Sequence, residues 1–462
     1  MRLSPPGQPA RKFLRLAAPM LLLIAVPALA QVPQPDAPAA GASVLPPPSM
    51  KGGPASASTS GEASLDDIRN FTRVYQIVKQ AYVEKVDDKT IMKAAIGGMV
   101  TGLDPHAEYL DKDGLDELSE DTTGQYSGLG IEVLQGDGEL RIVAPIDDTP
   151  ASRAGIKPGD LIVKVDGVPV DPQNIDEAYK KLRGPPGSKI VLTILHEKSD
   201  KPIDMPLVRE RIAVTSVKVR ELAPGYAYIR VSQFQEDTAT DVERKLGDLI
   251  KKNGPQKGAV LDLRSNPGGL LTSAVGVSDA FLDSGVIVTT RGRVPDANLH
   301  FDAHPGDLLN GAPMVVLVDN GTASAAEIVS GALKDHHRAL IMGRRTFGKG
   351  VVQTVLPLDD EHAVKITTAR YYTPNGTSIQ AEGINPDITL ADLAVNKSES
   401  PPQLIGSEAD LPNHLANESV AAKGAADEDD GKLAIADFAL SQALNVVRGL
   451  SLGRSHVAES AH

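Results

Sequence analysis

Two short stretches of the sequence decide the fold: Gly-Ala-Val-Leu-Asp-Leu-Arg-Ser-Asn-Pro-Gly-Gly at 258–269 and Pro-Met-Val-Val-Leu-Val-Asp-Asn-Gly-Thr-Ala-Ser-Ala-Ala-Glu at 313–327. Each begins with a continuous apolar run and continues into a loop of small residues ahead of a helix. Such runs are typical of strands covered on both faces of an α/β sheet. The alternation of strands and helices around them extends over 213–395. Because reaction sites in open α/β sheets lie at the carboxyl ends of strands, we expect the functional residues in these two loops.

Ser324 stands where the second of these loops becomes a helix, predicted over 325–334. A hydroxyl at that point lies beside unpaired N–H groups and the positive end of the helix dipole, which suits a nucleophile whose intermediate needs an oxyanion hole. Gly268 or Gly269 can present a second backbone donor, because neither has a side chain in the way. The alternative interpretation is that Ser324 only caps the helix, and position alone does not decide between the two.

A second candidate group lies in Phe-Gly-Lys-Gly-Val-Val-Gln at 347–353. Lys349 is expected in an apolar strand flanked by glycines, and Gln353 is expected on the same face under the period-two alternation of a strand. A desolvated lysine has a lowered pKa and can act as a neutral general base toward a serine hydroxyl, with Gln353 orienting its amine. The alternative is a solvated lysine on an edge strand, and the spacing alone does not exclude it.

Residues 122–212 have the pattern of a small β-rich module. The sequence predicts a hairpin around the 136–138 turn, a short helix at 151–154, a helix near 175–182 and a strand at 189–195. In the loop formed by Gly128, Leu129, Gly130 and Ile131, consecutive N–H groups can converge into a nest for a chain-terminal carboxylate. These glycines alone also fit an ordinary hairpin. Together with the 154–160 segment and the Asp166-Gly167 turn, they make the module resemble a PDZ domain.

The motifs as a set resemble those of the carboxy-terminal processing (tail-specific) peptidases. The resemblance extends from about residue 64 to 390 and rests on the following motifs: Asp262-Leu263-Arg264-x-Asn266-Pro267-Gly268-Gly269, Gly321-x-Ala323-Ser324-Ala325-x-Glu327-Ile328, Gly348-Lys349-Gly350 with Gln353, Tyr372-Thr373-Pro374-x-Gly376, Gly383-Ile384-x-Pro386-Asp387 and Leu103-Asp104-Pro105-His106. The family often has Ser where this chain has Ala326, a departure outside the expected catalytic residues.

This resemblance implies a serine endopeptidase without metal or organic cofactor. Ser324 would be the nucleophile, Lys349 the general base and Gln353 its positioning partner. The Gly268-Gly269 loop and the Ala325 amide would form the oxyanion hole. The implied fold is an α/β peptidase core of the crotonase and ClpP type, with an N-terminal helical unit and an inserted PDZ domain.

The resemblance also implies how substrates are chosen. The PDZ domain would bind unstructured carboxyl-terminal tails of protein substrates and gate the catalytic site. Arg183, at the end of the second PDZ helix, is a candidate for coupling the two, and its alternative is a solvated helix-terminal arginine. Two rival functions stay open: a PDZ scaffold on a non-catalytic peptidase fold, and a crotonase-like enzyme that takes an acyl thioester.

The amino terminus predicts export. A basic stretch that ends at Arg15 leads into an apolar segment of about thirteen residues, too short to span a bilayer, and into Ala28-Leu29-Ala30, a pattern that signal peptidase accepts. We therefore expect a signal peptide over 1–30 and a protein of the bacterial periplasm or cell envelope. Residues 31–63 are rich in Pro, Ala, Gly and Ser and are expected to form a disordered linker. Apolar residues then recur at helical spacing from Ile68 to Tyr82, as on the buried stripe of a helix, and a helical unit is predicted over 64–121.

Composition limits the classes of function and of active site that the chain can have. The chain of 462 residues has 47 Lys and Arg against 60 Asp and Glu, a net charge of −13 that disfavours binding to a nucleic-acid backbone. With no Cys, a thiolate nucleophile and Cys-ligated zinc are excluded. A polar linker and a terminal amphipathic helix are expected over 396–462. That helix is left with three interpretations: docking on the core, contact with a second copy, or binding of an adaptor protein.

Overall fold

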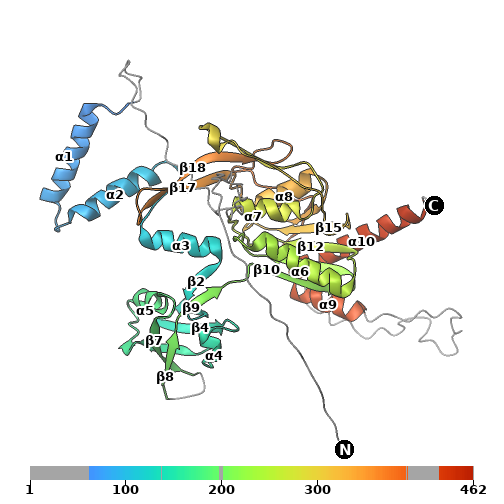
Figure 1. Cartoon of the computed structure of the whole chain (residues 1–462), viewed down its shortest axis with the longest axis horizontal. Helices are drawn as coiled ribbons and strands as arrows, with labels where there is room; N and C mark the ends of the chain where they lie inside the picture. Colours follow the sequence, from blue (N-terminus) through green and yellow to red (C-terminus); the bar gives the residue numbers. More distant parts are fainter. Residues whose placement is uncertain (1–61, 137, 197–200, 392, 394–425, 461–462) are drawn as a thin grey trace, which may run out of the picture. The chain divides into compact units, whose positions relative to one another are not determined.

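The computed structural model describes residues 62–136, 138–196, 201–391, 393 and 426–460. The expected signal peptide and almost all of the expected linker lie outside the described residues, as does most of the polar stretch that begins at 396. Within the described part of the chain, the elements fall into a central α/β unit, a second sheet, an N-terminal set of helices and the PDZ-like module (Figure 1).

The central unit is built on a six-stranded sheet. Its order is β10 (Val217–Ala223), β11 (Tyr226–Val231), β12 (Gly258–Asp262), β15 (Met314–Val318), β16 (Leu340–Gly343) and β19 (Ile388–Thr389). Every neighbouring pair is parallel except β10 and β11, which form an antiparallel pair. The two stretches that opened the sequence analysis are β12 and β15, paired side by side from Ala259–Met314 to Asp262–Leu317. Their carboxyl ends therefore meet at one edge, as predicted.

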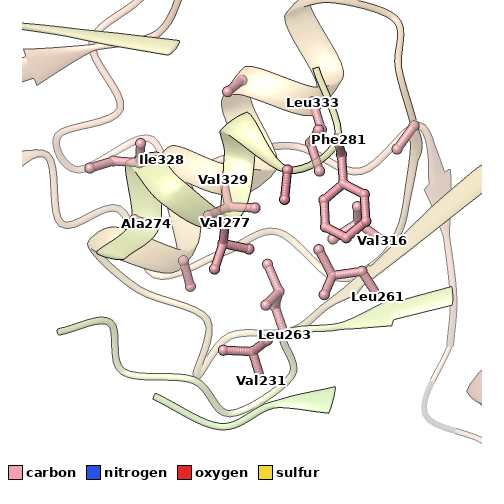
Figure 2. Close-up of a cluster of buried hydrophobic side chains, with 14 of the residues drawn as sticks. Val231, Leu261, Leu263, Ala274, Val277, Phe281, Val316, Ile328, Val329 and Leu333 are labelled. Atoms are coloured by element: carbon pink, nitrogen blue, oxygen red, sulfur yellow. The ribbon is translucent and has the colours of Figure 1, made fainter. Parts of the chain in front are cut away.

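Helices cover both faces of this sheet, which explains the continuous apolar runs. The helices α6 (Thr238–Asn253), α7 (Leu271–Asp279) and α8 (Ala325–Asp335) pack with Leu261 and Val316 on one face. Figure 2 shows the α7 and α8 side chains of this core against the two strands. The neighbouring residues Val260 and Val315 point to the opposite face, where they contact α10 (Phe438–Ser460). Because successive side chains of a strand alternate between faces, a strand covered on both sides has no solvent-facing position that would favour a polar residue.

The terminal helix is docked on the core, the first of the three interpretations left open by the sequence. Leu440, Ala443, Leu444 and Val447 of α10 are all at most 3% exposed and pack on the central sheet. A separate helix, α9 (Ala426–Ala436), precedes α10. Asp437 lies between them, and its carboxylate accepts the N–H of Leu440 at the start of α10.

A second sheet of five strands lies beside the expected catalytic segment. Its path is β1 (Glu108–Leu110), β18 (Ala363–Tyr372), β13 (Val286–Gly292) and β14 (His300–Asp302), and β17 (Val351–Pro357) also pairs with β18. The short 3-10 helix η1 (Pro295–Ala297) precedes β14. Strand β1 was not expected, since 64–121 was predicted as a helical unit. Its pairing with β18 joins residues more than 250 positions apart, and three residues of strand give little local signal.

The N-terminal region contains the helices α1 (Leu65–Ala81), α2 (Asp88–Thr101) and α3 (Lys112–Thr123). Each begins at a side-chain cap, on Ser64, Asp87 and Asp111 respectively, so the helix starts follow from sequence. The periodicity predicted a buried stripe on α1, and that part is wrong. The helix has no buried residue, and these apolar side chains are exposed: Leu65, Ile68, Phe71, Val74, Ile77, Val78 and Tyr82.

The PDZ-like module contains a six-stranded sheet with its own core. The sheet is formed by β3 (Ile131–Gly136), β4 (Glu139–Pro145), β5 (Leu161–Val165), β6 (Val168–Pro169), β7 (Lys189–Leu195) and β8 (Ile203–Val208). The helices α4 (Pro150–Arg153) and α5 (Ile175–Leu182) match the two predicted ones, and α5 and β7 have the predicted bounds. A two-stranded ribbon of β2 (Gln125–Gly128) and β9 (Glu210–Ala213) brings the chain into the module and out of it.

Among the described residues, no helix has the length and apolar character needed to cross a bilayer.

Candidate active site

A cavity of about 710 Å³ brings the predicted catalytic residues together. Ser324 and Ala325 line it from the start of α8, and Gly269 lines it from the loop after β12. Lys349 lines it from the loop before β17, and Gln353 lines it from β17 itself. Apolar side chains make up much of the remaining wall: Leu118, Leu270, Leu271, Leu299, Phe301, Ile328, Val351, Val352 and Val355.

Ser324 occupies a backbone conformation that serine rarely adopts. Its φ of 54° and ψ of −117° resemble those of the first central residue of a type II′ turn, a position that favours glycine. Such backbone strain costs about 1–3 kcal/mol and is found mainly at functional sites. The strained turn places the half-buried Ser324 side chain at the mouth of α8, on the wall of the cavity. A helix cap alone does not require this conformation, since the usual cap residue is extended.

Lys349 lies in a loop and not in the strand where it was expected. Strand β17 begins at Val351, and its pairing with β18 shifts register between Val352 and Gln353. The period-two argument that placed Lys349 and Gln353 on one face is therefore wrong, although both residues line the cavity. Burial, with the nearby charge of Lys365, lowers the pKa of the Lys349 amine below its ordinary value. Within the described part of the chain, the amine has no hydrogen-bond or ion-pair partner.

Gln353 is held by a chain of polar side chains behind it. Its Nε2 donates to Thr367 Oγ1 at 3.3 Å, and Thr367 is also hydrogen-bonded to the carboxylate of Asp104. Asp104 in turn accepts the N–H of His106, a further residue of the cavity wall. Because the amide nitrogen of Gln353 is engaged with Thr367, its oxygen is left to accept a hydrogen bond.

Tyr371 is a residue of this site that sequence reasoning missed. It is 2% exposed, and its hydroxyl donates to the carbonyl oxygen of Lys349. Burial and the charge of Glu327 raise the pKa of Tyr371 well above its ordinary value, against the opposite effect of a hydrogen bond from Ser324. Its hydroxyl therefore lies between the expected nucleophile and the backbone of the expected base. No local pattern marked it, because strand β18 is set against the cavity only by tertiary pairing.

The loop after β12 approaches the nucleophile closely. A Cβ built on Gly268 would lie 2.8 Å from the Cβ of Ser324 and 3.0 Å from the N of Ala325. With a φ of +104°, Gly268 is a position where only glycine fits without strain. The Gly268 N–H, however, donates to Asn266 Oδ1 at 2.9 Å, and Asn266 itself is fully buried. Gly268 is therefore not a free oxyanion donor, contrary to expectation, whereas the N–H groups of Gly269 and Ala325 donate to no described residue.

The expected peptide-binding loop leads into the first strand of the module's sheet. Gly128 ends β2, Leu129 is buried in the module's core, and Ile131 begins β3. Gly130 has a φ of +75°, and a Cβ there would lie 2.2 Å from Thr149, so the loop requires glycine. The N–H groups of Leu129 and Gly130 donate to no acceptor among the described residues. Half-buried apolar side chains of β3 and α5 continue from the loop: Ile131, Val133, Ile175 and Tyr179.

Arg183 pairs with an acidic group outside the PDZ-like module. Its guanidinium donates to the carboxylate of Glu120 on α3 at 2.6 Å, with about half of the arginine side chain and a quarter of the glutamate side chain exposed. Burial raises the pKa of Glu120 even with this partner beside it. The next residue, Asp121, lines the cavity, and its carbonyl accepts a hydrogen bond from Gln233. Helix α3 thus connects Arg183 with the cavity wall.

In the described residues, no group of three or more His, Asp or Glu side chains is arranged to hold a metal ion.

Three protein-family models match separate segments of the chain. The family described as "Peptidase family S41" matches residues 225–390, "PDZ domain" matches 141–195, and "Activating protease CtpB N-terminal domain" matches 49–114. The first match covers both stretches at the carboxyl ends of β12 and β15, together with the Lys349 segment.

Curated relatives extend the similarity over most of the chain. A "Carboxy-terminal-processing protease" of Bartonella bacilliformis is 42% identical over 392 residues, which are 83% of this chain and 88% of the relative. A "Probable CtpA-like serine protease" of Staphylococcus aureus is 36% identical over 335 residues, 71% of this chain and 65% of the relative. Among solved structures, "Photosystem II D1 C-terminal processing protease" is 30% identical over 69% of this chain and 92% of its own, with a TM-score of 0.42.

Proposed function

Because this chain belongs to the carboxy-terminal-processing proteases of peptidase family S41, with the α/β fold and PDZ domain of that family, we propose that it cleaves proteins with Ser324 as nucleophile and Lys349 as general base. The observation that carries the proposal is the shared cavity. It contains a serine hydroxyl at a strained loop-to-helix turn and a partly buried lysine whose pKa is lowered.

The neutral Lys349 amine takes the proton of the Ser324 hydroxyl as Oγ attacks the carbonyl carbon of the scissile peptide bond. The N–H groups of Ala325 and Gly269 donate to the oxyanion that forms. The Lys349 ammonium then gives its proton to the departing nitrogen, the C–N bond breaks, and an ester on Ser324 remains. A water molecule, deprotonated by the same amine, attacks this ester and releases the second product.

Gln353 keeps the Lys349 amine directed at Ser324. The Thr367 contact holds its Nε2 in place, so that Oε1 can accept a hydrogen bond from the amine of Lys349. This role fits a positioning partner, because a carboxamide neither gains nor loses a proton near neutral pH and so cannot act as the acid or base itself.

Substrates would be selected by their carboxyl-terminal tails. The unpaired N–H groups of the 128–131 loop suit a terminal carboxylate, and the apolar residues of β3 and α5 suit the side chains just before it. The ion pair of Arg183 with Glu120 supports coupling between tail binding and the cavity. The Arg183→Ala variant should lower turnover and leave the affinity for a tail peptide nearly unchanged, and unaltered turnover would count against coupling.

Cleavage of an unfolded protein by the wild type, Ser324→Ala and Lys349→Ala tests the dyad. We expect both variants to be inactive while they still bind a tail peptide. Equal cleavage by all three proteins would exclude the dyad. Binding without cleavage by the wild type would favour the PDZ scaffold interpretation.

Export is the remaining part of the proposal, with the signal peptide over 1–30 and the periplasm or cell envelope as destination. N-terminal sequencing of the protein from its native host should give a start near Gln31. An N-terminus that still includes residues 1–30 would contradict removal of the signal peptide.

A further inference from the structure

Glu327 is a buried carboxylate that the proposed reaction does not use. It lies one turn into α8, is fully buried and has no cation paired with it among the described residues. A buried carboxylate without hydrogen bonds costs several kcal/mol, so its partners indicate why it is present. All of them belong to the segments that contain Ser324 and Lys349.

Each carboxylate oxygen of Glu327 accepts two hydrogen bonds. Oε2 accepts the N–H of Ser324 at 2.8 Å and the N–H of Lys349 at 2.9 Å. Oε1 accepts the N–H of Gly348 at 2.8 Å and the hydroxyl of Thr346 at 2.5 Å. One oxygen atom therefore bonds the backbones of both proposed dyad residues, which are 25 positions apart in the sequence. We refer to these four bonds as the Glu327 bridge.

The bridge explains how a loop can position a catalytic base. Lys349 precedes β17 and has no strand pairing of its own, so the backbone bonds of the 346–349 loop decide where its side chain begins. Two of these backbone bonds, from the N–H groups of Gly348 and Lys349, end on Glu327, and the Thr346 hydroxyl adds a third bond from the same loop. The negative charge also lies at the N-terminus of α8, where the helix dipole stabilises it. The carboxylate meets N–H donors on both oxygens, so an uncharged amide cannot replace it without turning an NH₂ group toward N–H groups.

We propose that Glu327 is a positioning residue of the dyad, whose carboxylate fixes the distance between the Ser324 and Lys349 backbones and keeps the Lys349 amine inside the cavity. The inference rests on the proposed function. It predicts that loss of the bridge impairs the chemical step much more than it impairs substrate binding.

The test compares full-length Glu327→Gln with the wild type. We expect kcat to fall by about 10²-fold with KM changed less than about threefold, because misplacement of a base by one ångström costs about that much. We also expect the acidic limb of the kcat profile to move to higher pH, because the amine gains water when the loop relaxes. A kcat within threefold of wild type and an unmoved limb would overturn the proposal.

Asp307→Asn is the matched control for a purely structural effect. Asp307 is also a buried carboxylate, which accepts the N–H groups of Leu309 and Gly311 and pairs with Arg338, but it does not line the cavity. Its variant should lose thermal stability and keep its kcat per folded molecule. If Asp307→Asn loses as much kcat as Glu327→Gln at a similar loss of stability, Glu327 has no special role in positioning.

Thr346 supplies a second pair of variants that does not depend on whether Glu327→Gln folds. Thr346→Val keeps the side-chain volume and removes one donor of the bridge, whereas Thr346→Ser keeps the hydroxyl. We expect kcat about tenfold lower for the valine variant and near wild type for the serine variant, and equal kcat values for the two would overturn the proposal.

Ser324→Ala is measured alongside these variants. If Ser324→Ala cleaves like the wild type, the dyad itself fails, whereas an inactive Ser324→Ala beside a fully active Glu327→Gln refutes the bridge alone.

Discussion

Two buried carboxylates near the catalytic loops are bonded in opposite ways: Asp262 ends β12, and Glu327 lies in the first turn of α8, the helix that follows the neighbouring strand β15. Asp262, which is 2% exposed, binds mainly side chains: the guanidinium of Arg264 at 2.6 Å and the hydroxyl of Tyr228 at 2.8 Å, beside one backbone bond from the Arg264 N–H at 3.1 Å. Glu327, after β15, binds mainly backbone N–H groups. Side-chain partners connect one element with another, whereas backbone partners fix the path of the chain.

The Asp262 contacts lead away from the cavity and toward the C-terminal helix. Arg264 also donates two hydrogen bonds to Asp437, at 3.0 and 2.7 Å, where α10 begins. These charges hold α10 against the central sheet, together with the apolar contacts of Leu440 and Leu444. The two carboxylates therefore have different roles. Substitutions near Glu327 should lower the rate of the chemical step, and substitutions near Asp262 should lower the free energy of unfolding.

The largest expected effect is at Ser324. Ser324→Ala should lower the cleavage rate by roughly 10³-fold or more, since no other group can form the ester. Ser324→Gly should be equally inactive but more resistant to thermal unfolding than Ser324→Ala, by about 1 kcal/mol, because glycine adopts the backbone conformation of residue 324 without strain. Calorimetry on both variants measures this difference. An alanine variant at least as stable as the glycine variant would contradict the strain at this turn.

Tyr371→Phe should lower activity less than the Ser324 and Glu327 variants do. It removes the hydroxyl that contacts Ser324 and the carbonyl of Lys349, and the loss of such hydrogen bonds is worth about 1–1.5 kcal/mol, or roughly tenfold in kcat. Steady-state kinetics with a tail-bearing substrate gives the value. An unchanged kcat would show that Tyr371 takes no part in the reaction. It would also count against the claim that contacts around Ser324 and Lys349, where Glu327 binds, control catalysis.

Asp437→Asn should act on stability. The pair with Arg264 is partly exposed, so its contribution is limited to about 1 kcal/mol in the free energy of unfolding, with activity per folded molecule near wild type. Urea unfolding and activity are measured on the same preparation. A cleavage rate that falls more than about threefold at unchanged stability would show that the Asp262 contacts affect the catalytic loop. That result would contradict the different roles of the two carboxylates.

The smallest expected effects are shifts of the pH profile. Cleavage needs the neutral Lys349 amine, so the rate should rise with pH through its lowered pKa, and the midpoint of the rise should lie below 10.5, the ordinary lysine value. Lys365→Met removes a positive charge that lowers this pKa, so the acidic limb should move to higher pH. Asp104→Asn removes a negative charge that raises it, so the limb should move to lower pH. Each shift should be less than about one unit. Shifts in the same direction would contradict Lys349 as the titrating base.

Much of this architecture was predictable from the sequence because its signals are local. The apolar runs of β12 and β15 and the small-residue loops after them predicted the elements that position Ser324. The loop that contains Lys349 was wrongly predicted as strand. The apolar residues Val351 and Val352 indicate that a strand is present, but they do not indicate whether it begins before or after Lys349.

The residues that sequence reasoning missed depend on tertiary pairing. Tyr371 reaches the cavity only because β18 pairs with β17, and Asp104 reaches Thr367 only because β1 joins the same sheet. Glu327 did have a local signal, since Ser-x-x-Glu at 324–327 is the pattern of a capping box. That pattern predicts the bond to the Ser324 N–H, but not the three bonds to the 346–349 loop.

The central claim is that Lys349 acts directly on Ser324. The measurement that tests it most directly is a crystal structure of the wild type after reaction with a peptidyl phosphonate. The account predicts a covalent bond from Ser324 Oγ to phosphorus, the Lys349 Nζ within about 3.2 Å of that oxygen, and the phosphonyl oxygen facing the N–H groups of Gly269 and Ala325. An adduct on another residue, or a Lys349 amine turned away into water, would contradict it.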